Sequence, residues 1–392
     1  YYTDDKITDS FETTGSKSIF LVEKNGKTYL WEPFSLRQSS LYKISQNLYK
    51  NALGNKVIFE EINHDLEIRF TYEWNSTDHY GFVRKSSLYN IAESAIKVQF
   101  IDGIQNVLPY GIEEALQNST SNLVDAYKRT ELVEGSSLAI FALSAIIVDK
   151  AEPSEALKSN IVWSLGLQDP TILLSSLQLD EFRRGKEVIQ ETDVKAEKGA
   201  YFVHSEVALE PNASKKWLLV ADVNQTISDV VTTKLKIQTN LDLKSTILND
   251  VELGSDQLTE LVAASDGIQK TADGLLNIRH FSNTMFNIMR GGIFDDNYQI
   301  EKSDFVSYIE KLNKKVYRHK EALLNALPAL FKLEDLKALC QDDEDKNFKR
   351  LCCEYLPLKF SRRHGDPSRP WNKFSINTRN ENDGSKILDY QG

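Results

Sequence analysis

The stretch LEIRFTYEW, which runs from Leu66 to Trp74, alternates apolar and polar side chains at every position. Successive side chains of a β-strand point to opposite faces of a sheet, so this pattern gathers the apolar groups on one face. That face would carry Leu66, Ile68, Phe70, Tyr72 and Trp74, and the other face Glu67, Arg69, Thr71 and Glu73. The alternation predicts a strand of an antiparallel sheet, with one face on a core and the other in water.

A β-hairpin is predicted in SIFLVEKNGKTYLW, residues 18–31, where two apolar runs flank Asn25-Gly26. Asn-Gly is the dipeptide that most readily adopts the positive φ angles of a two-residue hairpin turn. Further runs of strand length are KVIFEEI, AIKVQFIDG, AIFALSAIIV, IVWSLGL, GAYFVHSEVAL and KWLLVADV. Many strands at this spacing, with few helical stretches between them, predict a large antiparallel β-sandwich over residues 1–240.

The period of the apolar residues changes near residue 245 from two to that of a helix. The residues at this spacing are Leu258, Leu261, Val262, Leu275, Ile278, Phe281 and Met285. Ser255 or Asp256 is the predicted N-cap of the first helix, and Gly291-Gly292 is predicted to end this block. We therefore expect a mainly β protein with α, in which a helical linker over 241–335 follows the sandwich and 336–392 is irregular.

Composition argues against several classes of partner. The chain has 392 residues, 41% of them hydrophobic, which is enough to bury a sizeable core in two or three domains. A net charge of −10 argues against binding to nucleic acid or to an anionic membrane. The three cysteines, Cys340, Cys352 and Cys353, fit a reducing compartment, so we expect a cytoplasmic protein. The basic stretches GFVRKSS and FRRGKEV are expected to be solvated surface.

The sequence contains none of the common catalytic signatures. It has no P-loop, no dinucleotide-binding glycine motif, no nucleophile elbow and no zincin motif. No spacing of cysteine and histidine makes a zinc site. We therefore expect no cofactor and no metal, and we assign no catalytic residue.

The densest group of polar and aromatic side chains lies in SRRHGDPSRPWNKFSI, residues 361–376. Guanidinium groups suit phosphate or sugar hydroxyls, an indole can stack on a pyranose ring, and carboxylate or amide groups bind hydroxyls. The candidate substrate-binding residues are Arg362, Arg363, His364, Asp366, Arg369, Trp371 and Asn372. The alternative is that they pin the segment to a neighbouring loop as scaffold.

Several stretches resemble one protein family. They are NLYKNALGNKVIFEEINHDLEIRFTYEW, SNLVDAYKRTEL, FALSAIIVDKAEPSEAL, NIRHFSNTMFNIMRGG and SRRHGDPSRPWNKFSI. These are similar to large bacterial proteins related to cellobiose and chitobiose phosphorylases. Those enzymes are the inverting glycoside phosphorylases of glycoside hydrolase family 94, in the six-hairpin glycosidase group. The resemblance covers most of the chain, from about Asn47 to Asn377. It implies a β-supersandwich similar to galactose mutarotase, a helical linker and then an (α/α)6 barrel that holds the active site.

This resemblance implies a role in carbohydrate metabolism. In inverting phosphorolysis, phosphate attacks the anomeric carbon while an acid protonates the leaving oxygen. The residues present leave no room for the barrel, so we expect the front part of a longer enzyme, inactive alone, with its general acid beyond this sequence. The expected partners are an oligosaccharide and inorganic phosphate, without nucleic acid or membrane. The family habit of pairing through the N-terminal domain implies a homodimer.

A second candidate substrate-binding group is Tyr127, Lys128 and Arg129, because loops of the family's supersandwich point toward the active site or the partner subunit. Two other functions remain open. A non-catalytic carbohydrate-binding or interaction sandwich would expose aromatic side chains such as Tyr72, Trp74 or Trp163, although the alternation favours the core for Trp74. A mutarotase or epimerase would need an acid/base set, for which His204 and Glu206 alternate correctly to share one face.

Overall fold

The computed structural model describes residues 10–38, 40–112, 116–117, 120–145, 157–290, 296–355, 357 and 382. The candidate residues Arg362 to Asn372 lie outside these ranges. The chain divides into two compact units, Tyr1–Gly254 (unit 1) and Ser255–Gly392 (unit 2). Each is described by itself.

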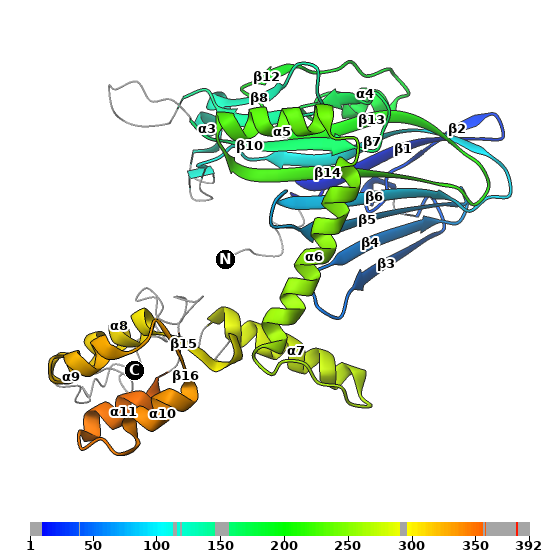
Figure 1. The fold of residues 1–392 in the computed structure, drawn as a ribbon. Coiled ribbons are helices and arrows are strands. Elements are labelled where there is room, and N and C mark those ends of the chain that lie inside the picture. The colour runs from blue at the N-terminus through cyan, green and yellow to red at the C-terminus, as the bar shows by residue number, and fades with distance from the viewer. Residues whose placement is uncertain are drawn as a thin grey trace. The chain divides into compact units, whose positions relative to one another are not determined.

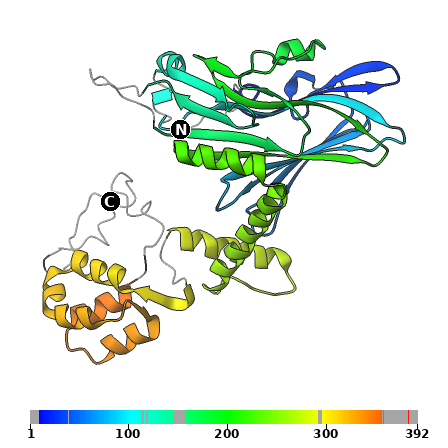
Figure 2. The same cartoon turned by 45° about the horizontal axis from the view of Figure 1, so that its top comes forward.

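Unit 1 contains two antiparallel sheets, which are seen together in Figures 1 and 2. Within the described residues, the five-stranded sheet has the order β11 (Thr171–Leu173), β13 (Gly199–Leu209), β7 (Ile96–Val107), β1 (Gly15–Lys24) and β2 (Lys27–Trp31). The nine-stranded sheet has the order β12 (Asp193–Lys195), β8 (Lys128–Leu132), β9 (Ala139–Leu143), β10 (Ser159–Leu165), β14 (Ser214–Gln225), β6 (Phe82–Asn90), β5 (Ile68–Ser76), β4 (Val57–Asn63) and β3 (Ile44–Lys50). The predicted fold class, mainly β with α and built on a large antiparallel sandwich, is confirmed.

The predicted hairpin is also confirmed. Strands β1 and β2 pair from Phe20↔Trp31 to Lys24↔Lys27, so Asn25 and Gly26 alone form the turn. Their φ angles are 54° and 71°, which asparagine and glycine adopt with least strain.

The main core lies between the two sheets, as the alternation in β5 predicts. Ile68 and Phe70 are fully buried, and Trp74 is partly buried against the same cluster. Phe70 faces Phe20 of the opposite sheet with 5.0 Å between ring centroids. The burial of such large apolar side chains contributes about 1.5–3 kcal/mol each to stability.

A buried ion pair crosses this core. Arg84 of β6 and Asp102 of β7 are both fully buried, and their bidentate contact has N–O distances of 2.6 and 2.9 Å. Asp102 also accepts hydrogen bonds from Ser18 Oγ at 2.6 Å, Ser86 Oγ at 3.0 Å and Trp217 Nε1 at 2.7 Å. The expectation that GFVRKSS is solvated is therefore wrong for Arg84, because its charge is neutralised inside the sandwich.

Helices cover part of each outer face of the sandwich. The short helix α4 (Leu179–Arg183) packs Leu179 and Phe182 against the five-stranded sheet. Helix α5 (Ile227–Thr239) and the start of α6 (Leu243–Ala263) pack apolar side chains against the nine-stranded sheet (Figure 1). Helix α6 continues without a break through 255 and 256, so the N-cap predicted there is wrong. Unit 1 also contains α3 (Ser121–Tyr127) and the 3-10 turn η1 (Leu36–Gln38).

Unit 2 is largely helical. Its further elements are α7 (Gly274–Arg290), η2 (Asp296–Tyr298), β15 (Gln299–Glu301), α8 (Lys302–Leu312), α9 (Lys314–Ala326), β16 (Leu330–Lys332), α10 (Leu333–Gln341) and α11 (Lys346–Glu354). Side chains from β15, β16 and helices α8 to α11 share one apolar core. No helix in the described part of the chain is long and apolar enough to cross a membrane.

Two helices of unit 2 lie where the sequence predicts irregular structure. Most of α10 and all of α11 fall within 336–392, which the sequence predicts to be irregular. Helix α11 forms because Asp345 caps it, accepting from the backbone N–H groups of Asn347 and Phe348 at 2.9 and 3.2 Å. Phe348 and Leu351 then bury themselves in the core of the unit.

Candidate functional site

The polar outer face of β3 to β6 and β14 forms the candidate site in unit 1. On β5 this face carries Arg69, Thr71 and Glu73, the residues that the alternation of LEIRFTYEW places in water. The strand register adds a polar residue from each neighbour. One row across the sheet reads Asn47, Glu60, Thr71, Ser87 and Lys216. Antiparallel strands lie about 4.8 Å apart, so Glu60 and Lys216 stand about 14 Å apart along this row.

From Glu60 to Lys216, this row forms the floor of a cavity of about 640 Å³. Thr71 and Ser87 are short, which leaves the middle of the floor hollow. Cross-strand neighbours on the flanking rows, Arg69 with Tyr89 and Glu73 with Lys85, rise on either side. Lys244 and Leu248 from the first turns of α6 add a further wall. We call this cavity the sheet-face pocket.

One end of the sheet-face pocket is organised around Glu60, which is 9% exposed. Its carboxylate accepts hydrogen bonds from Asn47 Nδ2 and from the Tyr49 hydroxyl, both at 3.0 Å. The hydrogen bond to Glu60 raises the pKa of Tyr49. The Arg69 guanidinium lies 4.7 Å from the centroid of the Tyr89 ring. The Tyr49 ring and a set of hydrogen-bonding groups thus lie together at this end, whereas Tyr89, on β6, lines the pocket two strands away from Glu60.

The other end of the pocket carries lysines. Lys216 is exposed on β14, and the Lys244 amine donates to the backbone oxygen of Lys216 at 3.4 Å. Burial, together with the charges of Lys215 and Lys216, lowers the pKa of Lys244. Among the described residues no carboxylate lies within ion-pair distance of either amine. By contrast, Lys85 is paired with Glu73 at 2.7 Å.

The pocket is suited to binding and not to catalysis by itself. Its hydroxyl, amide and charged groups can hold a polar ligand, while the tyrosine rings offer apolar surface. Both of its carboxylates are engaged, Glu60 with Asn47, Tyr49 and Arg69, and Glu73 with Lys85. No group among them is arranged as a free general acid.

The second candidate group predicted from the sequence lies elsewhere in unit 1. Lys128 is buried, and its amine contacts Asp125 Oδ1 at 2.6 Å and Gln117 Oε1 at 2.9 Å. Arg129 contacts Asp193 at 2.9 Å across the β8–β12 ladder. Neither residue lines the sheet-face pocket, nor does Tyr127.

The structure also shows the surroundings of the residues that the two alternative functions would use. Tyr72 and Trp163 are buried at 9% and 2% exposure, so they offer no exposed sugar platform. His204 and Glu206 do share the outer face of β13, as predicted. However, Glu206 is bound by Lys97 at 2.9 Å and Gln99 at 2.9 Å, and these contacts lower its pKa. Burial lowers the pKa of His204, whose ring packs edge-on against Phe182.

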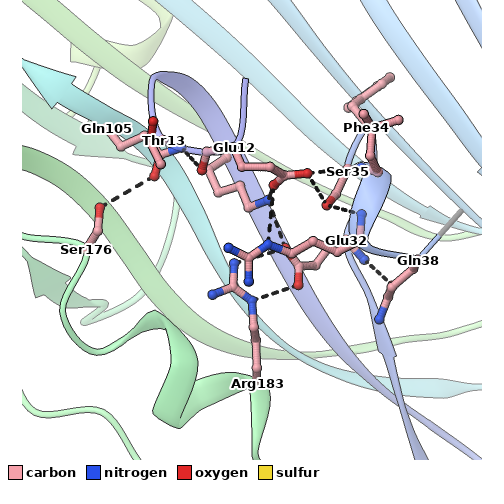
Figure 3. Close-up of polar contacts among 12 residues, drawn as sticks. Glu12, Thr13, Glu32, Phe34, Ser35, Gln38, Gln105, Ser176 and Arg183 are labelled. Carbon is pink, nitrogen blue, oxygen red and sulfur yellow. Dashed lines mark hydrogen bonds and ion pairs between the residues drawn. The ribbon is translucent and has the colours of Figure 1, made fainter. Parts of the chain in front are cut away.

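A cluster of ion pairs near the start of β1 is a second concentration of charge (Figure 3). Lys17 contacts Glu12 and Glu32, and Arg183 holds Glu32 in a bidentate pair at 2.7 and 3.0 Å. Arg183 also contacts Asp180 at 2.6 Å. Positive and negative groups match here, so the cluster ties α4 to β1 and β2. The expectation that FRRGKEV is solvated is wrong for Arg183, because Glu32 neutralises it in a largely buried position.

Sequence reasoning missed the sheet-face pocket as a unit. The signal available was the polar face of LEIRFTYEW, which contributes Arg69, Thr71 and Glu73. Its partners Glu60, Ser87 and Lys216 come from strands whose pairing the local sequence does not show.

Comparison with known protein families gives a match within unit 2. Residues 294–357, which contain η2 to α11, match the model of Glycoside hydrolase family 149 insertion domain 1. No curated protein matches the chain. The matching model is of family 149, so the narrower prediction of family 94 stays a prediction.

Solved structures with likeness to the chain include a bacterial glucoamylase complexed with acarbose, at 10% identity and a TM-score of 0.39 over 76% of this chain and 42% of the glucoamylase. A polysaccharide lyase matches at 14% identity and a TM-score of 0.33, over 57% of this chain and 28% of the lyase. A galactose mutarotase-like protein from Clostridium acetobutylicum matches at 10% identity and a TM-score of 0.24, over 57% of this chain and 83% of that protein. The chain thus spans less than half the length of the first two, and likeness at these TM-scores carries no argument. Through residues 294–357, the chain is related to carbohydrate-active proteins of the glycoside hydrolase kind.

Proposed function

We propose that this chain is the sandwich-bearing part of a carbohydrate-active enzyme, an inverting glycoside phosphorylase or hydrolase, and that the sheet-face pocket binds its saccharide. The observation that carries the proposal is the match of residues 294–357 to an insertion domain of a glycoside hydrolase family. The volume of the pocket and the side chains that line it support the proposal that the saccharide binds there.

Several features of the pocket suit a saccharide. Sugars present hydroxyl groups around a ring whose faces are apolar, so their sites combine hydrogen-bonding side chains with aromatic surface. Tyr49 and Tyr89 supply the aromatic surface, and Glu60, Thr71 and Ser87 supply hydrogen-bonding groups along one row. Because the row lies on a sheet, its side chains are held by the strand register and need little ordering when a ligand binds.

In this proposal the sandwich binds and the chemistry takes place in a barrel outside the described residues. There phosphate or an activated water would attack the anomeric carbon while a general acid protonates the leaving oxygen. Arg362 to Asn372 remain candidates for one wall of that site, where guanidinium groups would hold phosphate or sugar hydroxyls.

The test is binding of neutral gluco-oligosaccharides to the whole chain by isothermal titration calorimetry. Thr71→Trp places an indole on the pocket floor and is expected to abolish binding. Thr28→Trp is the matched control, because Thr28 is an exposed strand residue of the other sheet. Melting followed by circular dichroism checks that both variants fold.

Two results would contradict the proposal. Binding that survives Thr71→Trp would place the sugar elsewhere, and absence of binding to the unaltered chain would remove the sugar altogether. Incubation with oligosaccharide and inorganic phosphate tests whether the chemistry takes place elsewhere. The chain alone is expected to release no sugar phosphate and no shorter sugar. If a longer protein containing this chain also shows no turnover, the non-catalytic carbohydrate-binding alternative is favoured.

A further inference from the structure

The sheet-face pocket has an uneven distribution of charge. Four cationic side chains line it, Arg69, Lys85, Lys216 and Lys244, against the carboxylates Glu60 and Glu73. Lys85 is neutralised by Glu73 at 2.7 Å, and Arg69 Nε lies 3.9 Å from the Glu60 carboxylate. The two lysines at the β14 and α6 end have no such partner among the described residues.

These two lysines also lie close to each other. The Lys244 amine reaches the backbone oxygen of Lys216, and Lys215 precedes Lys216 on the same strand. Burial and, after it, the like charges of Lys215 and Lys216 disfavour the charged amine and lower the pKa of Lys244. An anion placed between the amines would relieve this repulsion.

Between the lysines and Glu60 the floor of the pocket is neutral. Thr71 and Ser87 occupy the middle of the row, so about 14 Å of surface joins the end that holds Glu60 and Tyr49 to an end with spare positive charge. A simple inorganic anion would use only the lysine end. A chain of sugar rings with an acidic substituent would use the whole row.

We propose that the sheet-face pocket takes an acidic saccharide, whose carboxylate or sulfate group lies against Lys216 and Lys244 while its neutral part extends over Thr71 toward Glu60. This rests on the proposed function, since it specifies the chemical class of the saccharide that the same pocket binds.

The experiment compares two tetrasaccharides of the same β-1,4 linkage, one of glucose and one of glucuronate, by calorimetry with the whole chain. Glucuronate is expected to bind about tenfold more tightly, the effect of one charge-assisted hydrogen bond. Raising the salt concentration should reduce this preference, because added ions screen partly exposed charges. A sulfated glucose tetrasaccharide separates the two sources of negative charge.

Neighbouring lysines provide matched variants. Lys216→Gln removes a charge from the pocket and is expected to lower the affinity for glucuronate about tenfold and that for glucose by a much smaller factor. Lys215→Gln removes the same charge one residue earlier, where the side chain lies on the opposite face of β14 in register with the buried Leu88. It is expected to change neither affinity by more than a small factor.

The failures of the two proposals can be told apart. Equal affinity for the glucose and glucuronate tetrasaccharides, both unaffected by Lys216→Gln, would overturn the acidic saccharide and leave the saccharide site standing. Binding of neither sugar would overturn both. If inorganic phosphate alone binds at Lys216 and no tetrasaccharide competes with it, the pocket is an anion site and the acidic saccharide is again overturned.

Discussion

Replacing Asp102 by asparagine is expected to destabilise unit 1 more than any exposed substitution in it. The carboxylate accepts bonds from Arg84, Ser18, Ser86 and Trp217, all inside the core between the sheets. An amide keeps the shape of the side chain but has one acceptor oxygen and no charge. The Arg84 guanidinium would then remain buried without a counter-ion.

The size of the effect follows from this loss of charge. Removing one partner of a buried ion pair costs about 3–5 kcal/mol, because the remaining charge stays out of water. For a unit of this size each kcal/mol shifts the melting temperature by about 2–4 °C, so a fall of roughly 6–20 °C is expected. Arg84→Met combined with Asp102→Leu removes both charges and is expected to recover part of the stability.

Urea unfolding followed by tryptophan fluorescence measures the change, since Trp217 itself donates to Asp102. Glu206→Gln is the control, because it breaks an exposed ion pair with Lys97 on the same sheet and is expected to leave the midpoint unchanged. The reasoning is refuted if Asp102→Asn costs less than about 1 kcal/mol, or if the double variant is less stable than the single one.

Three further outcomes are expected. Burial alone would raise the pKa of Glu32, but the hydrogen bond from Arg183 and the charge of a neighbouring lysine lower it below its ordinary 4.5. The stability that this pair contributes is therefore complete above about pH 4.5 and is lost as the pH falls through the lower pKa of the folded state. Glu32→Gln should flatten the acid side of a plot of melting temperature against pH. Burial raises the pKa of the thiols of Cys340 and Cys352, whereas Cys353 is exposed. Mass spectrometry after brief alkylation of the native protein at neutral pH should therefore find the label on Cys353 alone. Equal labelling of all three cysteines would contradict the packing of unit 2. A Cβ on Gly103 would lie 2.0 Å from the backbone oxygen of Tyr201. Gly103→Ala should therefore push β7 away from β13 and lower the melting temperature sharply. An unchanged melting temperature would disprove this close approach.

The elements of unit 1 could be predicted because their signals are local. Alternation in LEIRFTYEW reflects the pleat of a single strand, and Asn25-Gly26 determines its own turn. The N-cap predicted at Ser255 failed because a local cap signal cannot exclude a helix that began earlier at Leu243. Tertiary packing of α6 on the sheet decides where that helix begins.

The site could be predicted only in part. Arg69, Thr71 and Glu73 are identifiable as a polar face, but that face becomes a pocket only when β14 brings Lys216 alongside β6. This pairing joins residues far apart in the sequence, and no local pattern contains it. Nor does a single sequence distinguish a buried arginine such as Arg84 from a solvated one, because its partner lies in the other sheet.

Strand β3 gives the sheet-face pocket an open border. It is the last strand of its sheet, with β4 on one side and, within the described ranges, no strand on the other. Its backbone groups on that side can receive another extended segment, and Leu48 beside them is 66% exposed. Because Tyr49 of β3 lines the Glu60 end of the pocket and Asn47 of the same strand binds Glu60, a strand added there would lengthen the binding row by one residue. A segment that paired with this edge would therefore change the length of ligand that the same sheet could hold.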